Sequence, residues 1–593
     1  MKKFYILVLF ISAFGSQAQV INFPDPNLKT ALLVPGVARN NWFQSIDNID
    51  ANGNGEIEIY EASQVYVLDI NTRNITELIG MEYFMNLHSL DCGQNLISSL
   101  SPLNDLPIAS LGIYGNQFSG ILNLTGFESL QYLDCNSNDI TSLNLNGLNL
   151  LGLQCADNEI STLDVSVFTQ MTSLDCSNNL LTDLDVTALT NLNYLLCSGN
   201  ALSSLNLNTQ PNLLSLYCNN NNLSQLNLQP LVNLQFLDCS FNNLTQINVP
   251  SPSSLVRLYC ASNNLSSLSL LGLNALYLLN CDDNNLSSLT LSGLDNLNTL
   301  ECRNNNLASL DFTGMPWVRN VYCSYNNFST MNTFGAAYID NLDCSHNMIT
   351  SLILSGGGPH NVNCSHNEIS VLNTGNIGNI DCSFNSLTSL SFVGSFNNGR
   401  TSISCGNNQL TSLTLTGQTS WLEKLHCENN QLSTLVIPIT SFWTPLDLDC
   451  SNNNLISLFL GNQRGESPIN FSGNPNLSYI CEDSDQVSEL QTLAASYGYN
   501  NCSVDSACVL KTDEVEVYKL FTIYPNPATD VLHVKSKENT SITSLSVYNT
   551  LGQLIITVTN PQQTIDVSEL LSGNYFIKIT SNKGIANARF VKK

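Results

Sequence analysis

Oxygen-bearing side chains recur at short intervals in one segment near the N-terminus of this 593-residue chain. Asp50, Asn52, Asn54 and Glu61 stand at positions 1, 3, 5 and 12 of the segment, and the backbone carbonyl of Glu56 stands at position 7. Carboxylate and carbonyl oxygens are the ligands that Ca²⁺ prefers, and a glutamate can supply two of them at once. The spacing therefore predicts a Ca²⁺ site formed by these five residues.

The segment resembles the calcium-binding loop of EF-hand proteins, because Gly55 at position 6 and Ile57 at position 8 also match that pattern. Asparagine in place of aspartate at positions 3 and 5 lowers the charge of the ligand set, which favours a weak, extracellular type of affinity. The sequence shows no clear pair of helices around the loop. An Asn- and Gly-rich turn, followed by the acidic start of a helix, is therefore the alternative interpretation.

Two of the six histidines could act together. His346 and His366 each follow a cysteine by two residues, so they should lie side by side if those cysteines are equivalent positions of a repeat. With His360 they form a candidate transition-metal site, although no carboxylate accompanies them, and solvated turn residues are the alternative. The sequence contains no GxSxG, HExxH or phosphate-binding-loop signature. We therefore predict that the protein is not an enzyme.

The twenty cysteines are spaced too regularly for a disulfide framework. Nine of them follow one another at steps of 21 residues, which marks a single position of a repeat. These nine are Cys176, Cys197, Cys218, Cys239, Cys260, Cys281, Cys302, Cys323 and Cys344.

Each repeat reads LxxLxCxxNxL followed by xxLxL, as in the stretch from Leu234 to Val249. We count eighteen units between Cys92 and Cys450, with Ile113 in place of the cysteine in the second unit. This pattern resembles the short bacterial class of leucine-rich repeats and, more loosely, internalin-type arrays. The resemblance implies a mainly β solenoid, and the second half of the unit predicts short strands on both sides of the coil.

Successive side chains of a strand point to opposite faces, so the sequence predicts which repeat positions face inward and which face outward. In LxC the leucine and the cysteine point inward, and the residue between them points outward. The asparagine that follows ends the strand and can hydrogen-bond the backbone of the turn. Adjacent strands lie ~4.8 Å apart, which exceeds the ~3.8 Å between the Cβ atoms of a disulfide, so we predict free, buried thiols.

Outward-facing aromatic residues gather in the middle repeats. On a rigid sheet such residues favour contact with a protein or a glycan, although β-favouring residues that merely fill sheet positions are the alternative. The predicted ligand-binding patch consists of Tyr194, Tyr217, Phe236, Phe241 and Tyr259.

The N-terminus reads as a secretory signal peptide, with Lys2 and Lys3 before an apolar run and a small-residue cleavage site at Ala18. An N-terminal core helix is the alternative. No later stretch is long and apolar enough to span a bilayer. Acidic residues outnumber basic ones 47 to 20, and the net charge of −27 disfavours nucleic acid and anionic membrane surfaces as partners.

The ends of a repeat stack need caps. A helix near Leu28 to Leu33 and a strand near Tyr66 to Ile70 are expected in the N-terminal cap, and a helix from Asp485 to Tyr497 in the C-terminal one. Three cysteines lie outside the regular ladder near the C-terminal cap, so three pairings are open. Among Cys481, Cys502 and Cys508 we predict that Cys481 pairs with Cys502.

From residue 520 the sequence alternates like the strands of a small β-sandwich. YPNPATDVLHV, LSVYNTLGQLI, LLSGNYFIKI and the terminal ARFVKK resemble the type IX secretion C-terminal sorting domain of Bacteroidetes. The resemblance implies export by the type IX machinery to the cell surface or beyond; a sandwich that itself binds ligand is the alternative. The matching residues are Tyr524, Pro525, Asn526, Pro527, Gly552, Gly573, Tyr575 and Lys592.

These features predict a secreted or surface-bound recognition or adhesion protein that binds a protein or polysaccharide through its solenoid. A structural surface-layer component without a specific ligand is the alternative. The predicted order is signal peptide 1–18, N-terminal cap 19–90, solenoid 91–470, C-terminal cap 471–508, linker 509–519 and sorting domain 520–593.

Overall fold

The computed structural model shows two compact units, Met1–Ser503 and Val504–Lys593. The predicted signal peptide, the predicted linker, Cys508 and Gly552 lie outside the residues that the structure describes. The described residues are 19–41, 43–251, 253–336, 338–354, 359–374, 377–394, 401–417, 422–437, 445–461, 465–506, 521–536, 540–549, 554–559, 561–582 and 584–593.

The N-terminal cap begins with α1 (Pro26–Leu32), as the sequence predicts. The helix starts here because Pro26 fits its first turn and the Asp25 carboxylate accepts the backbone N–H groups of Asn27 and Leu28. The same carboxylate accepts the backbone N–H of Thr76 at 2.6 Å, which ties the cap to the first repeat. The cap also contains β1 (Ala38–Arg39), β2 (Ser45–Ile46) and α2 (Ile59–Ala62).

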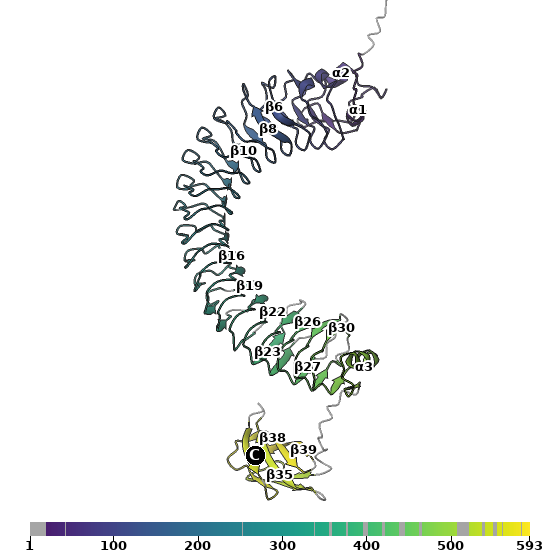
Figure 1. Ribbon diagram of the computed structural model, residues 1–593, viewed down its shortest axis with the longest axis vertical. Coiled ribbons are helices and arrows are strands. Elements are labelled where there is room, and N and C mark those ends of the chain that lie inside the picture. The colour runs from purple at the N-terminus through teal and green to yellow at the C-terminus, as the bar shows by residue number, and fades with distance from the viewer. Residues whose placement is uncertain are drawn as a thin grey trace, which may run out of the picture. The chain divides into compact units, whose positions relative to one another are not determined.

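The repeats stack into one long sheet along the inner side of an arc (Figure 1). From β3 onward its strands pair in parallel, and from β3 to β22 each pairs in register with the equivalent strand of the next repeat. Its strands after β1 and β2 are β3 (Val67–Asp69), β4 (Ser89–Asp91), β5 (Ser110–Gly112), β7 (Tyr132–Asp134), β9 (Gly152–Gln154), β10 (Ser173–Asp175), β11 (Tyr194–Leu196), β12 (Ser215–Tyr217), β13 (Phe236–Asp238), β14 (Arg257–Tyr259), β15 (Leu278–Asn280), β16 (Thr299–Glu301), β17 (Asn320–Tyr322), β19 (Asn341–Asp343), β21 (Asn361–Asn363), β22 (Asn379–Asp381), β24 (Thr401–Ser404), β26 (Leu422–His426), β28 (Leu446–Asp449) and β30 (Glu466–Asn470).

The predicted short strands on the opposite side are present, but among the described residues they occur only in some of the repeats. Between β8 and β18 the described residues show one isolated bridge there, Asn227 with Asn248. The arc explains this, because repeats held at strand spacing on the inner side spread apart on the outer side (Figure 1). The opposite-side strands are β6 (Ser119–Asn123), β8 (Asp139–Asn144), β18 (Thr330–Asn332), β20 (Ser351–Ile353), β23 (Ser389–Gly394), β25 (Ser412–Gly417), β27 (Thr434–Val436), β29 (Ser457–Phe459) and β31 (Tyr479–Cys481). Two 3₁₀ turns, η1 (Met81–Tyr83) and η2 (Ser101–Leu103), lie in the first repeats.

The repeat interior has the predicted arrangement. Leu237 and Cys239 are buried, and the cysteine is a free thiol, like the other ladder cysteines. The side chain of Asn242 donates to the carbonyls of Cys218 and Cys239. It also accepts the backbone N–H of Leu223 at 2.9 Å, so this asparagine closes the turn between two repeats.

At the C-terminal end α3 (Val487–Ser496) caps the stack, as predicted, but the predicted disulfide is wrong. Cys481 is disulfide-bonded, whereas Cys502 is a free thiol. Strand β32 (Ser503–Asp505) runs beside β31, and the backbone N–H of Ser503 donates to the carbonyl of Ser478. Cys502 therefore lies at the start of β31, away from Cys481 at its end.

The second unit is the predicted β-sandwich. Three strands, β33 (Phe521–Tyr524), β34 (Val531–Ser536) and β37 (Thr564–Asp566), form one sheet. The other sheet contains β35 (Ile542–Tyr548), β36 (Leu554–Thr559), β38 (Gly573–Ser581) and β39 (Gly584–Lys592). Leu532, Leu545, Ile577 and Phe590 meet in the core between them.

Candidate ligand-binding surface

Each short strand of the inner sheet turns its middle residue inward and its first and third residues outward. We call the positions equivalent to Ser215 the first row and those equivalent to Tyr217 the third row. The register of neighbouring strands is unbroken from β3 to β22, so each row repeats one side chain about every 4.8 Å along the arc. The inner face is therefore a rigid grid of outward side chains.

Four of the five predicted ligand-binding aromatics lie together on this grid. Tyr194 and Phe236 belong to the first row, and Tyr217 and Tyr259 belong to the third row of the consecutive strands β11 to β14. The Arg257 guanidinium lies 5.1 Å from the centre of the Phe236 ring, which extends the patch by one residue that the sequence analysis did not include. We call these five residues the aromatic patch.

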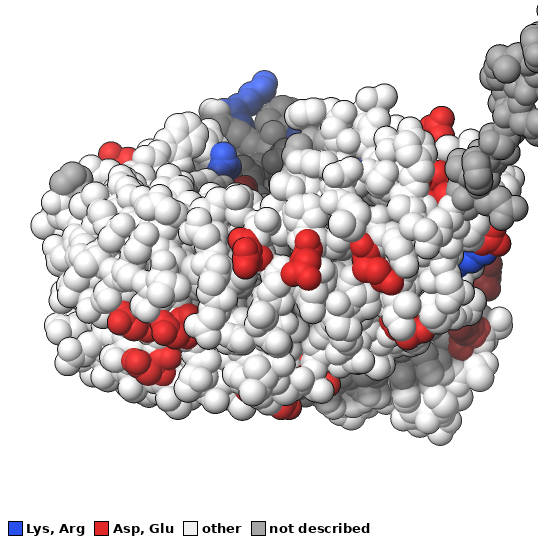
Figure 2. All heavy atoms as spheres, turned by 90° about the horizontal axis from the view of Figure 1, so that it is seen from above, with Lys and Arg blue, Asp and Glu red and all other residues white. Residues whose placement is uncertain are grey.

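The third row is rich in acidic residues, which occur from its first repeat to its last ones. Its described strands carry no Lys or Arg at this position, and burial raises the pKa of Asp91 and of Asp134. Figure 2 shows the same excess of Asp and Glu over Lys and Arg on the face seen from above. The acids of the row are Asp69, Asp91, Asp134, Asp175, Asp238, Glu301, Asp343, Asp381 and Asp449.

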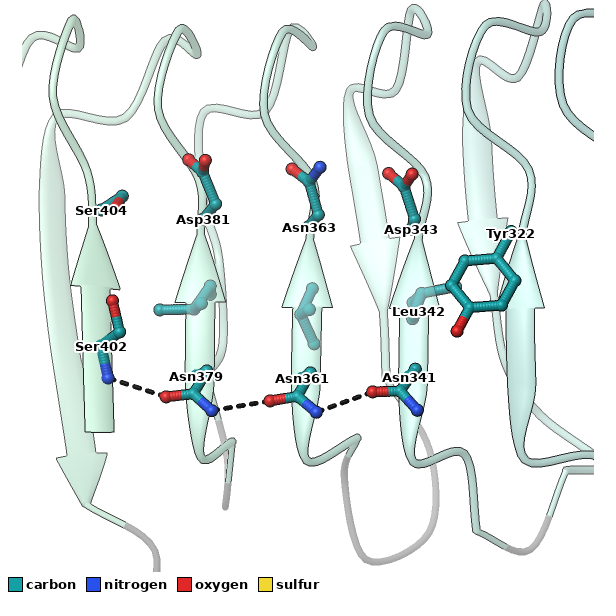
Figure 3. Close-up of a pocket in the computed structure, with 12 residues that line it drawn as sticks. Tyr322, Asn341, Leu342, Asp343, Asn361, Asn363, Asn379, Asp381, Ser402 and Ser404 are labelled. Carbon is teal, nitrogen blue, oxygen red and sulfur yellow. Dashed lines mark hydrogen bonds between the residues drawn. The ribbon is translucent and has the colours of Figure 1, made fainter. Parts of the chain in front are cut away.

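A groove of about 370 Å³ crosses β17, β19, β21, β22 and β24, and a ladder of side-chain amides lines it (Figure 3). Asn341 donates to Asn320 at 2.6 Å, Asn361 donates to Asn341 at 2.7 Å, and Asn379 donates to Asn361 at 2.6 Å. The Asn379 oxygen accepts the backbone N–H of Ser402 at 2.8 Å. This amide ladder was not predicted from the sequence, although asparagine three residues before the ladder cysteine in four consecutive repeats is its signal.

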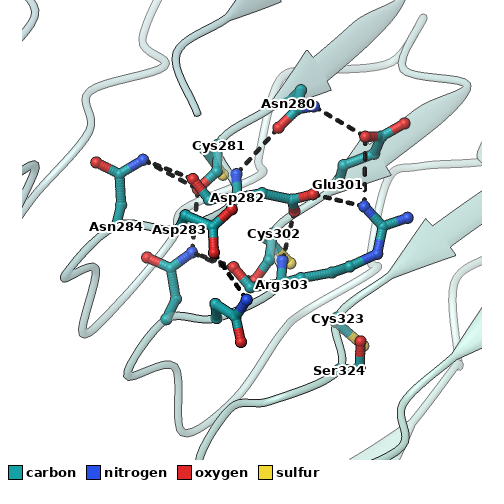
Figure 4. Close-up of polar contacts among 12 residues, drawn as sticks. Asn280, Cys281, Asp282, Asp283, Asn284, Glu301, Cys302, Arg303, Cys323 and Ser324 are labelled. Atoms are coloured by element: carbon teal, nitrogen blue, oxygen red, sulfur yellow. Dashed lines mark hydrogen bonds and ion pairs between the residues drawn. The ribbon is translucent and has the colours of Figure 1, made fainter. Parts of the chain in front are cut away.

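One arginine stands at the edge of this groove and is held by carboxylates (Figure 4). Arg303 forms ion pairs with Asp282 and, at 3.5 Å, with Glu301. Its guanidinium lies 4.5 Å from the centre of the Tyr322 ring, which lines the groove. Glu301 in turn accepts the side-chain amide of Asn280 at 2.9 Å, so the charges of this cluster are paired.

The turn position two residues after the ladder cysteine carries a separate set of rings. Tyr325, His346, His366 and Phe384 stack in this order with ring centroids 4.2, 4.1 and 4.2 Å apart. The predicted proximity of the two histidines is thus confirmed, and burial together with His366 lowers the pKa of His346. Phe241, the fifth predicted aromatic, occupies this turn position with φ 54° and does not belong to the inner sheet that carries the aromatic patch.

The N-terminal loop turns its two charged ends toward its own backbone. The Asp50 carboxylate accepts the N–H groups of Gly53, Asn54 and Gly55, at 2.8, 3.1 and 2.8 Å. The Glu61 carboxylate accepts the N–H of Ala51 at 2.7 Å. The first and last positions of the predicted ligand set therefore both bond the backbone of the same loop.

Glu58 at position 9 of the loop was missed by the sequence analysis. Its carboxylate accepts the side-chain amides of Asn52 and Asn54, and its backbone N–H donates to Glu61. Burial raises the pKa of Glu61, and Glu58 raises it further. Glu56 turns its carboxylate outward to Lys29 at 2.7 Å. Among the described residues no group of three or more His, Cys, Asp or Glu side chains could hold a metal ion.

In the second unit, the structure joins the two ends of the predicted sorting motif. The side chain of Asn526 accepts the backbone N–H of Val591 at 2.8 Å, and Ala528 forms a bridge with Lys592. Gly573 pairs with Lys592 across β38 and β39, and Tyr575 stacks on Phe590. Tyr524, Pro525 and Pro527 lie at the end of β33 and in the turn after it.

Comparison with known proteins supports each unit separately. Residues 522–593 match the secretion system C-terminal sorting domain family. The protein therefore carries a type IX sorting domain, and it is exported to the cell surface or secreted. No curated protein matches the chain, and no helix among the described residues is long and apolar enough to cross a membrane.

Solved structures resemble the solenoid. YopM from Yersinia enterocolitica WA-314 is 21% identical over 71% of this chain and 92% of its own, with a TM-score of 0.52. The leucine-rich-repeat ectodomain of the receptor kinase GASSHO1/SCHENGEN3 from Arabidopsis thaliana is 18% identical over 71% and 62%, with a TM-score of 0.50. The functional domain of InlJ from Listeria monocytogenes is 21% identical over 97% and 98%, with a TM-score of 0.41. The first two show the leucine-rich-repeat fold.

Proposed function

We propose that this exported protein recognises a protein or polysaccharide ligand through the inner face of its solenoid, and that it binds without catalysis. The observation that carries the proposal is the aromatic patch on four consecutive strands. Large aromatic rings on a rigid support bury much surface on binding and lose little conformational entropy. Tyr194 is 47% exposed, so part of this surface is accessible.

The placement of the rings favours recognition over a purely structural surface role. An even scatter of aromatic residues would suit many weak contacts, whereas rings gathered in one place suit a defined partner. In the described rows of the inner face, Tyr132 and Tyr322 are the further aromatics, and each lies several strands from the patch. The four rings on β11 to β14 therefore form the main concentration.

We expect the triple variant Tyr217→Ala, Phe236→Ala and Tyr259→Ala to lose most of its ligand affinity, by about 10-fold or more. Binding would be measured on arrays of proteins and glycans and then by calorimetry with each positive ligand. The matched control is Val167→Ala, Val232→Ala and Leu271→Ala, since these three exposed apolar residues lie outside the inner sheet. Equal binding by wild type and the aromatic variant would remove the patch from the proposal.

We also propose that the N-terminal loop binds Ca²⁺. Asp50 and Glu61 face the loop from its two ends, and Glu58 and Glu61 are only 4% and 7% exposed. Among the described residues no ion pair reaches either glutamate. Two neighbouring, nearly buried carboxylates repel each other, and a divalent cation would offset that repulsion.

Glu61→Gln is expected to weaken Ca²⁺ binding by about 10-fold or more, because it removes the bidentate carboxylate of position 12. Calorimetric titration of Ca²⁺ into the purified protein measures this directly. Glu56→Gln is the control, since it removes the same charge from a side chain that points to Lys29 while the position 7 carbonyl stays. Equal losses in both variants would indicate a nonspecific charge effect.

A further inference from the structure

The amide ladder leaves hydrogen-bonding capacity unused along the groove. A carboxamide has two N–H donors and two acceptor lone pairs. Within the ladder, Asn341 and Asn361 each spend one donor and one lone pair on a neighbouring asparagine. One donor and one acceptor per strand therefore stay available on each of these side chains (Figure 3).

The third-row side chains on the other side of the groove also have unused hydrogen-bonding capacity. Asp343, Asn363 and Asp381 each use one oxygen, Oδ1, to accept the N–H and the hydroxyl of the serine two residues later. The other terminal atom of these side chains is a carboxylate oxygen in the two aspartates and the amide nitrogen in Asn363. The groove thus offers two parallel rows of polar atoms, both repeated at the strand spacing.

We infer that this groove binds a neutral linear polysaccharide that lies along the arc, across the strands. The inference rests on the proposed function and specifies its ligand. A sugar hydroxyl both donates and accepts a hydrogen bond, so it matches rows in which donors and acceptors alternate. A chain of six-membered sugar rings linked at opposite ring positions presents hydroxyl groups on both edges at every ring, so its polar groups recur at a spacing close to the ~4.8 Å between strands.

An extended polypeptide and an acidic glycan fit less well. Equivalent backbone groups of an extended polypeptide recur every two residues, at ~6.7 Å, which does not match strands ~4.8 Å apart. The groove lining contains Asp343 and Asp381 and no Lys or Arg, so its field repels uronate or sulfate groups. A neutral, hydroxyl-rich polymer satisfies both constraints.

One end of the groove has a fixed aromatic wall. Tyr322 lines the groove, and Arg303 stacks on its ring at 4.5 Å. Because Asp282 and Glu301 both pair with Arg303, the guanidinium is held in place (Figure 4). The Tyr322 ring that packs against the guanidinium is held with it. A preorganised aromatic ring that supports a sugar requires such a second layer of contacts.

The test uses affinity electrophoresis of the full chain in gels that contain hydroxyethylcellulose, galactomannan, acidic alginate or unfolded casein. The groove variant is Asn341→Leu with Asn361→Leu, since Leu278 already occupies this row in β15. The control is Asn191→Leu with Asn212→Leu, a half-buried and an exposed asparagine outside the inner sheet that also bond the preceding repeat. If the groove variant fails to fold by circular dichroism, Asp343→Ser with Asp381→Ser replaces it.

We expect at least one neutral polysaccharide to retard wild type and the control equally, and the groove variant to bind at least 10-fold more weakly. Alginate should retard none of them. The inference is overturned if neither neutral polymer retards wild type, if the groove variant binds like wild type, or if casein binding is what the variant loses. The triple variant at Tyr217, Phe236 and Tyr259 is tested in the same gels. If only this variant loses binding, the groove inference is overturned and the proposed recognition function stands.

Discussion

The free energy of unfolding of the solenoid is expected to fall steeply once the pH exceeds about 8.5, the pKa of a thiol in an unfolded chain. Seventeen ladder cysteines, from Cys92 to Cys450, are buried and free. Burial raises the pKa of Cys197 and of Cys382 to about 12. It raises the pKa of every other ladder thiol beyond its ordinary range.

The direction follows from proton binding. Above pH 8.5 the unfolded chain loses thiol protons that the folded chain keeps, so the stabilisation present below 8.5 is lost as the pH rises toward 12. Each thiol contributes about 1.4 kcal/mol per pH unit in that window. Seventeen together contribute roughly 24 kcal/mol per unit, which exceeds the net stability of about 5–15 kcal/mol of ordinary domains. We therefore expect unfolding between about pH 9 and 10.

Circular dichroism during urea titrations at pH 7.5, 8.5 and 9.5, with a reductant present, measures the effect. A pH-stat gives an independent count, because unfolding at pH 9.5 should release about fifteen protons from the ladder thiols. Unfolding midpoints that agree at pH 7.5 and 9.5 would contradict the prediction. A proton release near zero would also contradict the prediction, because it would mean that the thiols ionise equally in the folded and the unfolded chain.

The repeat positions could be predicted because each residue type has one physical role there. Cys239 is small and apolar enough for the strand interior, and Asn242 is the side chain that can satisfy the backbone of the following turn. The strand period then places Phe236 and Asp238 outward without knowledge of the other repeats. For the same reason four of the five predicted aromatics lie together.

Features that depend on how repeats meet could not be predicted in this way. In the described part of the middle repeats the opposite side has one isolated bridge and no strand, because the arc separates the repeats there, and a single repeat holds no information on curvature. The predicted partner of Cys481 fails for such a reason, because the bond from Ser503 to Ser478 places the preceding Cys502 near the start of β31, whereas Cys481 stands at its end. Phe471 takes the ladder position beyond Cys450, and Asn474 bonds the carbonyls of both residues. The cysteine pattern does not identify this last unit, because a phenylalanine takes the place of the cysteine.

The amide ladder was missed for a further reason. Asparagine favours turns, and its frequency throughout these repeats masks the few asparagines that stand within strands. Asn341 and Asn361 acquire their role only when neighbouring strands pair in register and bring the amides to hydrogen-bonding distance. Alignment of the repeats on the first row, rather than on the cysteine, is the analysis that would reveal it.

Replacement of Asn242 by alanine is expected to lower the free energy of unfolding by about 3–5 kcal/mol. The side chain is 7% exposed and donates to the carbonyls of Cys218, Cys239 and Ser240, at 3.0, 3.2 and 3.2 Å. It also accepts the N–H of Leu223. Alanine leaves these buried groups without a partner, and each costs about 1–3 kcal/mol when water cannot reach it.

The neighbouring Asn243 provides the matched control, because it is exposed and Asn243→Ala should change stability by less than about 0.5 kcal/mol.

A second variant, Asn242→Asp, separates the effect of hydrogen bonding from the effect of side-chain volume. It keeps the acceptor for Leu223 but turns a second oxygen toward three carbonyls, so it should destabilise more than Asn243→Asp. Urea unfolding gives the global values, and hydrogen exchange at the Leu223 amide reports the local effect. Hydrogen exchange of the Leu223 amide should be faster in Asn242→Ala than in Asn242→Asp, because only the aspartate variant retains the acceptor. Equal acceleration in both variants would mean that the acceptor bond contributes nothing to closing the turn.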